Sequence, residues 1–461
     1  MAYLSRPTPP TSRFEVLTEQ AVCQTGRHLC RSNDGRRSRR ARSARHTSFV
    51  ATETRLVPVT ISSMQRLMER RHFLKAAGAV VALGAVDACR LLPEFGAATT
   101  SQQLQLAQLR LSVDHITRLT VCTRPFRAHG PRTDVEKLGA KTVVHNYGHG
   151  GSGWSLSWGA GSMATASAMA TQERDIAVIG CGAIGLTTAI QLQRAGARVT
   201  IYAKDLPPNV RSSWATGLYT PDSRIALEEH ATPEFKQTWA KAARQTYETF
   251  QSFLGVAGTP VEYIDNYGVS DEQGPRQRNE PEGKPEFAEL QRELTPDLMP
   301  APVEYQPGSH PFGQRWVRRN SQLMFNLSSY QRILLEDFAD NGGKIEIAEF
   351  HTPADIARVK EKTVVNCTGY GARALFGDQS VVPVRGQITR LISQVDATYG
   401  LRYKDTSFVP RRDGLLLQVT GENDYYGYGD ETVVPDRAEA EHAVTTIASL
   451  FPGAVAERKT A

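Results

Sequence analysis

Residues 175–189, DIAVIGCGAIGLTTA, decide the fold of this chain. A short apolar run leads into Gly180-x-Gly182-x-x-Gly185, and a helix-forming stretch follows directly. In this context the first glycine permits a tight turn, the second lets the backbone approach a pyrophosphate, and the third lets the helix pack closely on the strand. The start of the helix then offers free N–H groups to the negative charge. The stretch therefore predicts a dinucleotide-binding site.

The rest of the chain alternates short β-branched runs with helical stretches. Expected strands cover 175–180, 197–204, 344–350 and 362–369, and expected helices cover 184–196 and 328–342. Strands that alternate with helices predict a mainly parallel α/β sheet. Residues 259–313 are rich in proline and glycine, and we expect irregular loops there.

The second expected strand ends in YAKDLPP (202–208), near the place where a ribose-binding acid is expected. Lys204 stands close to that place, and Asp205 follows it. A lysine there suits the 2′-phosphate of NADP. The motif alone therefore leaves FAD and NADP both open.

Charge argues against a nucleic-acid partner for the folded part. The chain has a net charge of +6, but residues 1–71 hold fourteen arginines, no lysine and five acidic residues, a net charge of +9. The remaining 390 residues therefore carry −3. Binding to a nucleic-acid backbone needs a basic surface on the domain itself. The six cysteines show no metal-type spacing, and we expect no metal site.

The first 111 residues have the composition of processing segments. Residues 1–67 are polar and arginine-rich, which predicts a disordered extension or a start codon placed too far upstream. Residues 68–89 resemble a twin-arginine export signal, in which Arg70 and Arg71 precede an eleven-residue apolar run. Cys89 ends a stretch that resembles a lipoprotein cleavage site and would become a lipidated N-terminus. With 90–111 as a linker, we expect an exported protein of the periplasm or cell envelope.

Four segments of the chain together resemble the D-amino-acid oxidase family of FAD enzymes. They are VTIYAKDLPP (199–208), SSWATGLYTP (212–221), VVNCTGYGA (364–372) and PVRGQI (383–388). The resemblance extends from Val113 to about Gly453 and implies FAD as the cofactor. It also implies a Rossmann-type FAD-binding domain joined to a substrate domain with an antiparallel sheet.

The most specific match is VVHNYGHGGSGWSLSWG, residues 143–159. In the family this loop lies against the flavin ring, where backbone N–H groups stabilise the charge of the reduced ring. Glycine is needed because a Cβ would hold the backbone away from a flat ring. The match assigns the carbonyl of Gly151 to the substrate amine. Without the family, the stretch is a glycine-rich structural loop with two surface histidines.

The resemblance also assigns substrate contacts. TRPFR (123–127) matches the family segment whose first arginine binds the substrate carboxylate, and that residue is Arg124. A guanidinium holds a planar carboxylate through two parallel hydrogen bonds. Tyr403 falls on the position of a mobile-lid tyrosine. Ser407 departs from the family, because it stands where a second tyrosine shares the carboxylate, and Leu417-Gln418-Val419-Thr420 replaces a glycine-rich segment.

The cofactor contacts expected from the motif and the resemblance come from five segments of the chain. They are Gly150, Gly153, Trp154, Ser155, Gly180, Gly182, Ala183, Ile184, Gly185, Lys204, Asp205, Ser212, Ser213, Gly217, Leu218 and Thr368.

The order of these segments differs from that of the family. The arginine and glycine-loop segments end the family's chains, but here they precede Gly180, which predicts a circular permutation. We expect 112–168 to be the permuted substrate and flavin-ring segment. The FAD-binding domain then spans 173–453, interleaved with substrate parts at 255–330 and 383–430, and 454–461 form a tail.

The resemblance implies oxidative deamination of D-amino acids. A hydride passes from the substrate Cα to flavin N5, and molecular oxygen reoxidises the flavin to give hydrogen peroxide. Two alternatives stay open. One is a flavin dehydrogenase that passes electrons to a membrane acceptor, which a lipid anchor at Cys89 would suit. The other is a flavin-binding module without amino-acid turnover, which Ser407 motivates.

Overall fold

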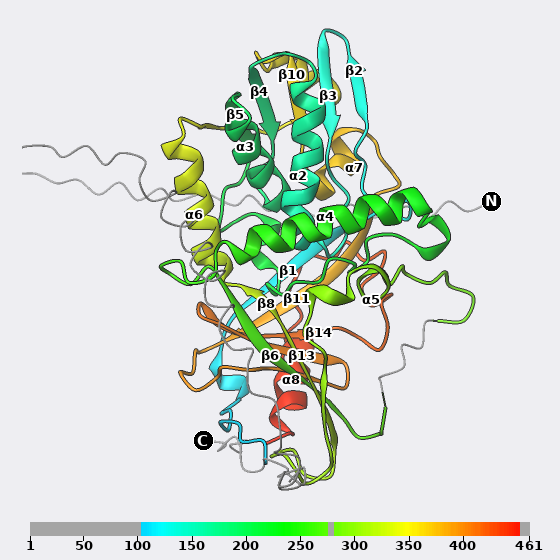
Figure 1. Cartoon of the computed structure of the whole chain (residues 1–461), viewed down its shortest axis with the longest axis vertical. Coiled ribbons are helices and arrows are strands. Elements are labelled where there is room, and N and C mark those ends of the chain that lie inside the picture. Colours follow the sequence, from blue (N-terminus) through cyan, green and yellow to red (C-terminus); the bar gives the residue numbers. More distant parts are fainter. Residues whose placement is uncertain (1–102, 275–280, 452–461) are drawn as a thin grey trace, which may run out of the picture. The chain divides into compact units, whose positions relative to one another are not determined.

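The computed structural model describes residues 103–274 and 281–451 (Figure 1). Several predictions lie outside these residues: the extension over 1–67, the export signal over 68–89, the lipid site at Cys89, the linker up to residue 102, and the tail over 454–461. Within the described ranges, no helix is both long and apolar enough to cross a lipid bilayer.

The first sheet has six strands in the order β2-β3-β10-β4-β5-β9, and all except β2 run parallel to their neighbours. Its strands are β2 (Val135–Leu138), β3 (Lys141–His145), β4 (Asp175–Ile179), β5 (Arg198–Ala203), β9 (Lys344–Ile347) and β10 (Thr363–Asn366). The predicted parallel α/β sheet is confirmed.

The central strands β10, β4 and β5 of this sheet are almost entirely buried because both of its faces are covered. Helices α2 (Gly153–Met169), α3 (Ala183–Arg194) and α6 (Leu327–Asp340) pack in one core with Ile176 and Val178 of β4. Figure 1 shows these helices beside the strands. The alternate residues of β4 pack with Ile356 and Val359 on the other face. Three further helices are α4 (Pro233–Gln251), α5 (Leu290–Leu294) and α7 (Ala372–Leu375).

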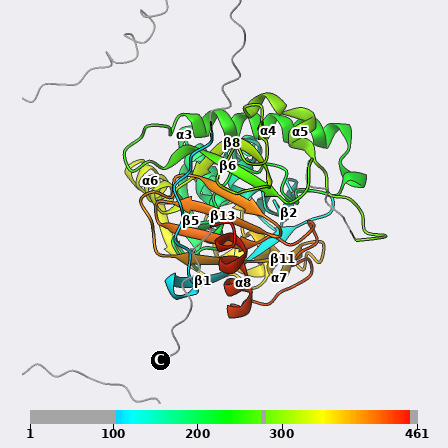
Figure 2. The same cartoon turned by 90° about the horizontal axis from the view of Figure 1, so that it is seen from below.

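The second sheet has eight strands in the order β1-β11-β14-β13-β12-β6-β8-β7, and only the neighbours β12 and β6 are parallel. Its strands are β1 (Ile116–Phe126), β6 (Val261–Ser270), β7 (Val303–Tyr305), β8 (Trp316–Phe325), β11 (Val382–Leu391), β12 (Gly400–Tyr403), β13 (Thr406–Arg411) and β14 (Gly414–Val419). Helix α8 (Arg437–Ala448) covers one face of this sheet (Figure 2).

The loop prediction for 259–313 is wrong over its first third. Residues 261–270 form the ten-residue strand β6, which pairs along its whole length with β8. Buried residues recur along it at Val261, Ile264, Tyr267 and Val269. The prolines and glycines around this strand are typical of loops. Its pairing partners lie far away along the chain, so the local sequence does not reveal them.

The segment before Asp175 joins both sheets. Strand β1 pairs antiparallel with β11, from Ile116 opposite Leu391 to Phe126 opposite Val382. Strand β3 then pairs parallel with β10 in the first sheet, and α2 leads into β4. At the end of the expected linker, Leu109 and Leu111 are buried in one apolar cluster with residues 450 and 451.

Candidate active site

A cavity of about 1940 Å³ lies between one face of the eight-stranded sheet and the carboxyl ends of the parallel strands. From the six-stranded sheet it is lined by residues 146–151, 180–184, 204–205, 348–351 and 367–371, which follow β3, β4, β5, β9 and β10. Ligands of open α/β sheets bind at this edge. Pockets for one small ligand measure roughly 300–1,000 Å³. This cavity therefore has room for a dinucleotide together with a substrate.

The glycine turn after β4 has the geometry that the motif predicts. Gly180 has a φ of +106°, and a Cβ there would lie 2.6 Å from the carbonyl oxygen of Cys367. A Cβ on Gly185 would lie 2.0 Å from the carbonyl oxygen of Gly180. Helix α3 begins with no side-chain cap at Gly182. Its first turn therefore offers N–H groups and the positive end of the helix dipole to the cavity.

A second helix begins at the same cavity. The loop after β3 leads into α2, whose N-cap residue Ser152 makes no side-chain capping hydrogen bond. Gly150 N–H donates to the carbonyl of Pro125 at 2.8 Å, and Gly151 N–H donates to the carbonyl of Ser223 at 2.8 Å. A Cβ on Gly150 would lie 1.8 Å from the carbonyl oxygen of Arg224. The glycine loop is thus fixed between β1 and residues 223–224.

Several residues that line the cavity carry a buried polar atom with no hydrogen-bond partner among the described residues. They include Oδ1 of Asn146, whose side chain is almost fully buried, Oδ1 of Asn266 and Nε1 of Trp214. An unpaired buried polar group is costly, so such atoms indicate a ligand that completes them. Together with the glycine turns and the two uncapped helix starts, they fit a dinucleotide with a planar polar ring.

Most of the predicted site residues line this one cavity. They are Arg124, Gly150, Gly151, Gly153, Trp154, Gly180, Gly182, Ala183, Ile184, Lys204, Asp205, Ser212, Leu218 and Thr368. Trp154 Nε1 donates to the carbonyl of Ser212 at 2.9 Å, and Ser212 Oγ accepts from Ala183 N–H at 3.0 Å. These bonds join the glycine loop, the segment 212–221 and the glycine turn into one wall.

Four predicted cofactor contacts do not line the cavity and instead support its wall. Gly185 packs against the glycine turn. The Ser213 hydroxyl donates to Gln331 at 2.8 Å, and the Ser155 hydroxyl accepts from Thr220 N–H at 2.8 Å. A Cβ on Gly217 would lie 2.5 Å from the carbonyl oxygen of Phe325. For Ser155, Ser213 and Gly217 this corrects the prediction of direct contact, because the two hydroxyls are bonded to other segments of the chain and Gly217 packs against the backbone of β8.

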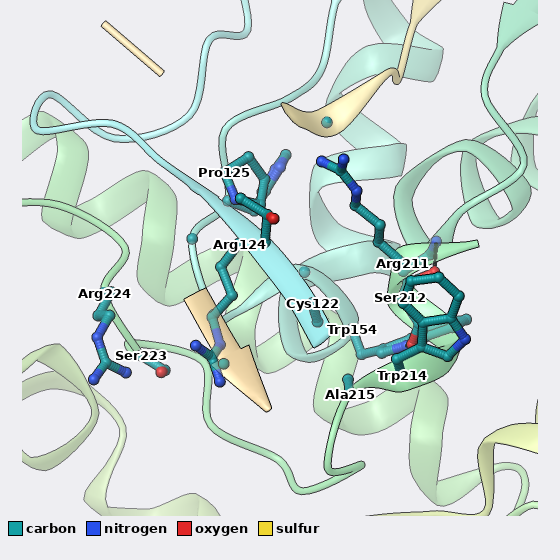
Figure 3. Close-up of a pocket in the computed structure, with 18 of the residues that line it drawn as sticks. Cys122, Arg124, Pro125, Trp154, Arg211, Ser212, Trp214, Ala215, Ser223 and Arg224 are labelled. Carbon is teal, nitrogen blue, oxygen red and sulfur yellow. Dashed lines mark hydrogen bonds between the residues drawn. The ribbon is translucent and has the colours of Figure 1, made fainter. Parts of the chain in front are cut away.

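Arg124 lies on β1 with its guanidinium over Gly386 of β11. A Cβ on Gly386 would meet Arg124 Nη2 at 2.3 Å, so only glycine leaves room for the side chain. Among the described residues, the one hydrogen bond from this guanidinium runs from Nη1 to the carbonyl of Arg385 at 3.1 Å. Its other N–H groups are available to a carboxylate. Figure 3 shows Arg124 extending into the pocket beside Ser223.

The structure does not bring Tyr403 to the cavity. Its side chain is 3% exposed and packs with Leu401 and Phe408, while its hydroxyl donates to Asp271 at 3.0 Å. Side chains alternate between the two faces of a strand, and Arg402 is the residue of β12 that lines the cavity. The lid role predicted for Tyr403 is therefore wrong, because the residue points to the face that α8 covers. Ser407, opposite Arg402 in β13, does line the cavity.

Sequence reasoning missed several cavity residues. Alternation along β8 brings Arg318, Asn320 and Gln322 to the cavity, and η3 (Arg211–Trp214) contributes Arg211. The periodicity of a half-buried strand was the available signal for β8. Lys204 Nζ lies 3.5 Å from a carboxylate oxygen of Glu349, so an acid from the loop that follows β9 lies beside the predicted ribose position.

His149 lies in the middle of the glycine loop, and the sequence analysis predicts no role for it. Its side chain is 3% exposed and lines the cavity. Burial lowers its pKa to about 3, so the imidazole is neutral near pH 7.

Comparison with known proteins finds a matching family and several similar proteins. A family model described as FAD dependent oxidoreductase matches residues 175–460. A D-amino-acid oxidase of Dictyostelium discoideum is 28% identical over 283 residues, which cover 60% of this chain and 73% of that protein. One from Streptomyces coelicolor is 30% identical over 290 residues, or 61% and 79% of the two chains. The glycine oxidase structure from Geobacillus kaustophilus aligns with 61% of this chain and 78% of its own, at 13% identity and a TM-score of 0.41.

Proposed function

The chain belongs to the family of FAD-dependent oxidoreductases, and we propose that it oxidises D-amino acids to imino acids with molecular oxygen as the electron acceptor. Bound FAD supplies the hydride acceptor, and oxygen then takes the two electrons as hydrogen peroxide. The names of the similar D-amino-acid oxidases support the substrate class. The observation that carries the proposal is the hydrogen bond of 2.8 Å between Gly150 N–H and the carbonyl of Pro125, which ties the glycine loop to the residue next to Arg124.

The described residues act by positioning the substrate. The guanidinium of Arg124 binds the carboxylate through two N–H groups. It lies directly over Gly386, where a Cβ would displace it. The carbonyl of Gly151 accepts from the amine, and the hydrogen bond between Gly151 N–H and the carbonyl of Ser223 holds this peptide in place. Two fixed points on the amino acid orient its Cα toward the ring, and such orientation supplies most of the rate in a hydride transfer.

Side-chain acid or base chemistry has a small part in this site. His149 is the histidine of the glycine loop that lines the cavity, and its lowered pKa of about 3 keeps it from accepting a proton near neutral pH. Ser407 stands in the place of a larger aromatic residue, and its hydroxyl donates to the carbonyl of Gln418 at 3.5 Å. The smaller side chain leaves more space in this part of the cavity, which favours substrates with long side chains.

Anaerobic reduction of the bound flavin tests the proposal. The purified full chain is mixed without oxygen with a panel of D-amino acids and with the matching L-amino acids, and the flavin spectrum is recorded before and after air is admitted. We expect D-amino acids alone to bleach the flavin, and peroxide to form when air enters. Bleaching that air does not reverse indicates a dehydrogenase, and a yellow protein that no amino acid bleaches indicates a binding module.

Two variants at one position separate carboxylate binding from general charge. Arg124→Ala removes the guanidinium, and Arg124→Lys keeps the charge but loses the paired N–H groups. Each charge-assisted hydrogen bond contributes about 1.5–3 kcal/mol, so we expect both variants to lower kcat/KM at least roughly 100-fold. Both variants should keep bound flavin. Loss of flavin, or turnover close to that of the wild type, would contradict the role of Arg124.

A further inference from the structure

Three cysteines of the described chain line the cavity, and they differ in surroundings. Cys181 and Cys367 belong to the core beside the glycine turn, and burial raises the pKa of each thiol to about 12. Cys122 lies on β1 between the buried residues Val121 and Thr123, and its own side chain is partly exposed. Because side chains alternate along a strand, Cys122 and Arg124 point to the same face. Figure 3 shows both in the pocket.

The position of Cys122 along β1 indicates which end of the flavin ring it lies near. The carbonyl of Pro125 accepts a hydrogen bond from Gly150 N–H of the glycine loop. We place the pyrimidine end of the ring at this loop, because the reduced ring carries its negative charge at that end and the start of α2 stabilises negative charge. A strand rises about 3.3 Å per residue, so Cys122 lies about 10 Å back from Pro125. That distance matches the length of the three fused rings. Cys122 therefore faces the opposite end, the benzenoid edge with its two methyl groups.

Two further features of the cavity indicate that it holds a ligand. β1 packs against η3, and Figure 3 shows Trp214 of η3 on the same side of the pocket as Cys122. Nε1 of Trp214 is buried and has no hydrogen-bond partner in the described chain, and the same holds for Oδ1 of the buried Asn146. Both residues line the cavity. These atoms call for a partner with polar groups, which the flavin and its ribityl chain carry.

The surroundings of Cys122 act on the pKa of its thiol in opposite directions. Burial is the largest influence and raises the pKa of the thiol, while the positive charges of Arg124 and Arg211 oppose it. Arg211 lines the cavity, and its guanidinium stacks over the Tyr370 ring at 5.0 Å. Two cations close to a thiol stabilise the thiolate as it forms.

We propose that Cys122 Sγ forms a covalent thioether with the methyl carbon on C8 of the flavin ring, which rests on the proposed position of FAD but not on the proposed substrate. The S–H bond and one methyl C–H bond break, and one C–S bond forms. The two electrons and two protons released reduce the ring. Molecular oxygen then removes them as hydrogen peroxide, which leaves an oxidised, covalently bound flavin.

Acid denaturation of the flavin-loaded full chain tests the bond. The yellow protein is precipitated with trichloroacetic acid, and the flavin fluorescence of the pellet and of the protein band on a denaturing gel is measured. We expect the wild type to keep its flavin in the band and Cys122→Ser to lose at least 90% of that signal, while the native variant is still yellow. Thr123→Ser, next to Cys122 but on the opposite face of β1, is the matched control, and its flavin should stay in the band.

Mass spectrometry of the wild type decides the question even where a variant does not fold. The peptide that contains Cys122 should gain the mass of FAD less two hydrogens. Flavin released into the acid supernatant, an alkylatable Cys122 thiol, or flavin attached to another residue would overturn the proposal.

The outcome is separable from that of the proposed function. If acid releases the flavin but D-amino acids still bleach the native protein, the covalent bond is refuted and the proposed oxidase function stands. If the flavin stays attached after acid but no amino acid bleaches it, the proposed oxidase function is refuted and the covalent bond stands.

Discussion

His149 should make the folded protein sensitive to mild acid. Its side chain is 3% exposed, and burial lowers its pKa from 6.5 to about 3. The folded state therefore binds this proton less readily than the unfolded state does. The contribution to stability is fully present above pH 6.5 and is lost as the pH falls from 6.5 toward 3. We expect His149→Gln, which cannot take up the proton, to remove this loss.

The size of the effect follows from the two pKa values. A difference of one pKa unit corresponds to about 1.4 kcal/mol, so the full penalty below pH 3 is on the order of 5 kcal/mol. Between pH 7.5 and pH 5 the expected loss is about 2 kcal/mol, because the unfolded chain takes up the proton over the lower part of that interval.

The assay compares urea unfolding of the flavin-saturated wild type and His149→Gln, followed by tryptophan fluorescence, at pH 7.5 and pH 5. Burial also lowers the pKa of His145 and His310. Both histidines are present in the two proteins, so their effects cancel in the difference between them. We expect the free energy of unfolding of the variant, relative to the wild type, to rise by about 2 kcal/mol at the lower pH. An unchanged difference would refute the assignment of a buried neutral His149.

Three further substitutions probe the wall of the cavity and the sheet behind it. Gly185→Ala would place a methyl group 2.0 Å from a carbonyl oxygen of the glycine turn, and we expect loss of bound flavin, measured by equilibrium dialysis. Gly150→Ala would place a Cβ 1.8 Å from the carbonyl oxygen of Arg224, at a residue whose φ is +53°. We expect this change to displace the glycine loop and to lower kcat at least roughly tenfold, while circular dichroism shows that the protein is still folded. Tyr403→Phe removes the hydrogen bond to Asp271 and should cost about 1 kcal/mol in unfolding free energy while kcat/KM stays within about twofold of the wild type.

The part of the fold that the sequence predicted is the part that local pattern determines. The buried run of β4, the turn at Gly180 and the start of α3 are consecutive, so one short stretch contains the pattern that identifies all three. The core strands β5 and β10 are likewise apolar on both faces. Local signals of this kind need no knowledge of distant partners.

Other features depend on pairing that sequence alone does not contain. Strand β6 is stabilised by β8, whose residues lie about fifty positions later, and by β12 still further along. The prediction for Tyr403 failed for a related reason. The register of a strand decides to which face of the sheet each side chain points, and a shift of one residue moves every side chain to the other face. Register in the short β12 brings Arg402, and not Tyr403, to the cavity.

We propose that the early place of residues 112–168 is a change of chain order and not of structure. The segment supplies β1 to one sheet and β3 to the other, and both strands pair with partners more than 200 residues later. Leu109 and Leu111 share a cluster with Leu450 and Phe451, so the two ends of the described chain meet. Joining those ends and opening the connection between α2 and β4, at 170–174, would keep every strand pairing. A family model read in linear order then begins at Asp175, where β4 starts, and leaves the moved segment unmatched although it contacts the same cavity.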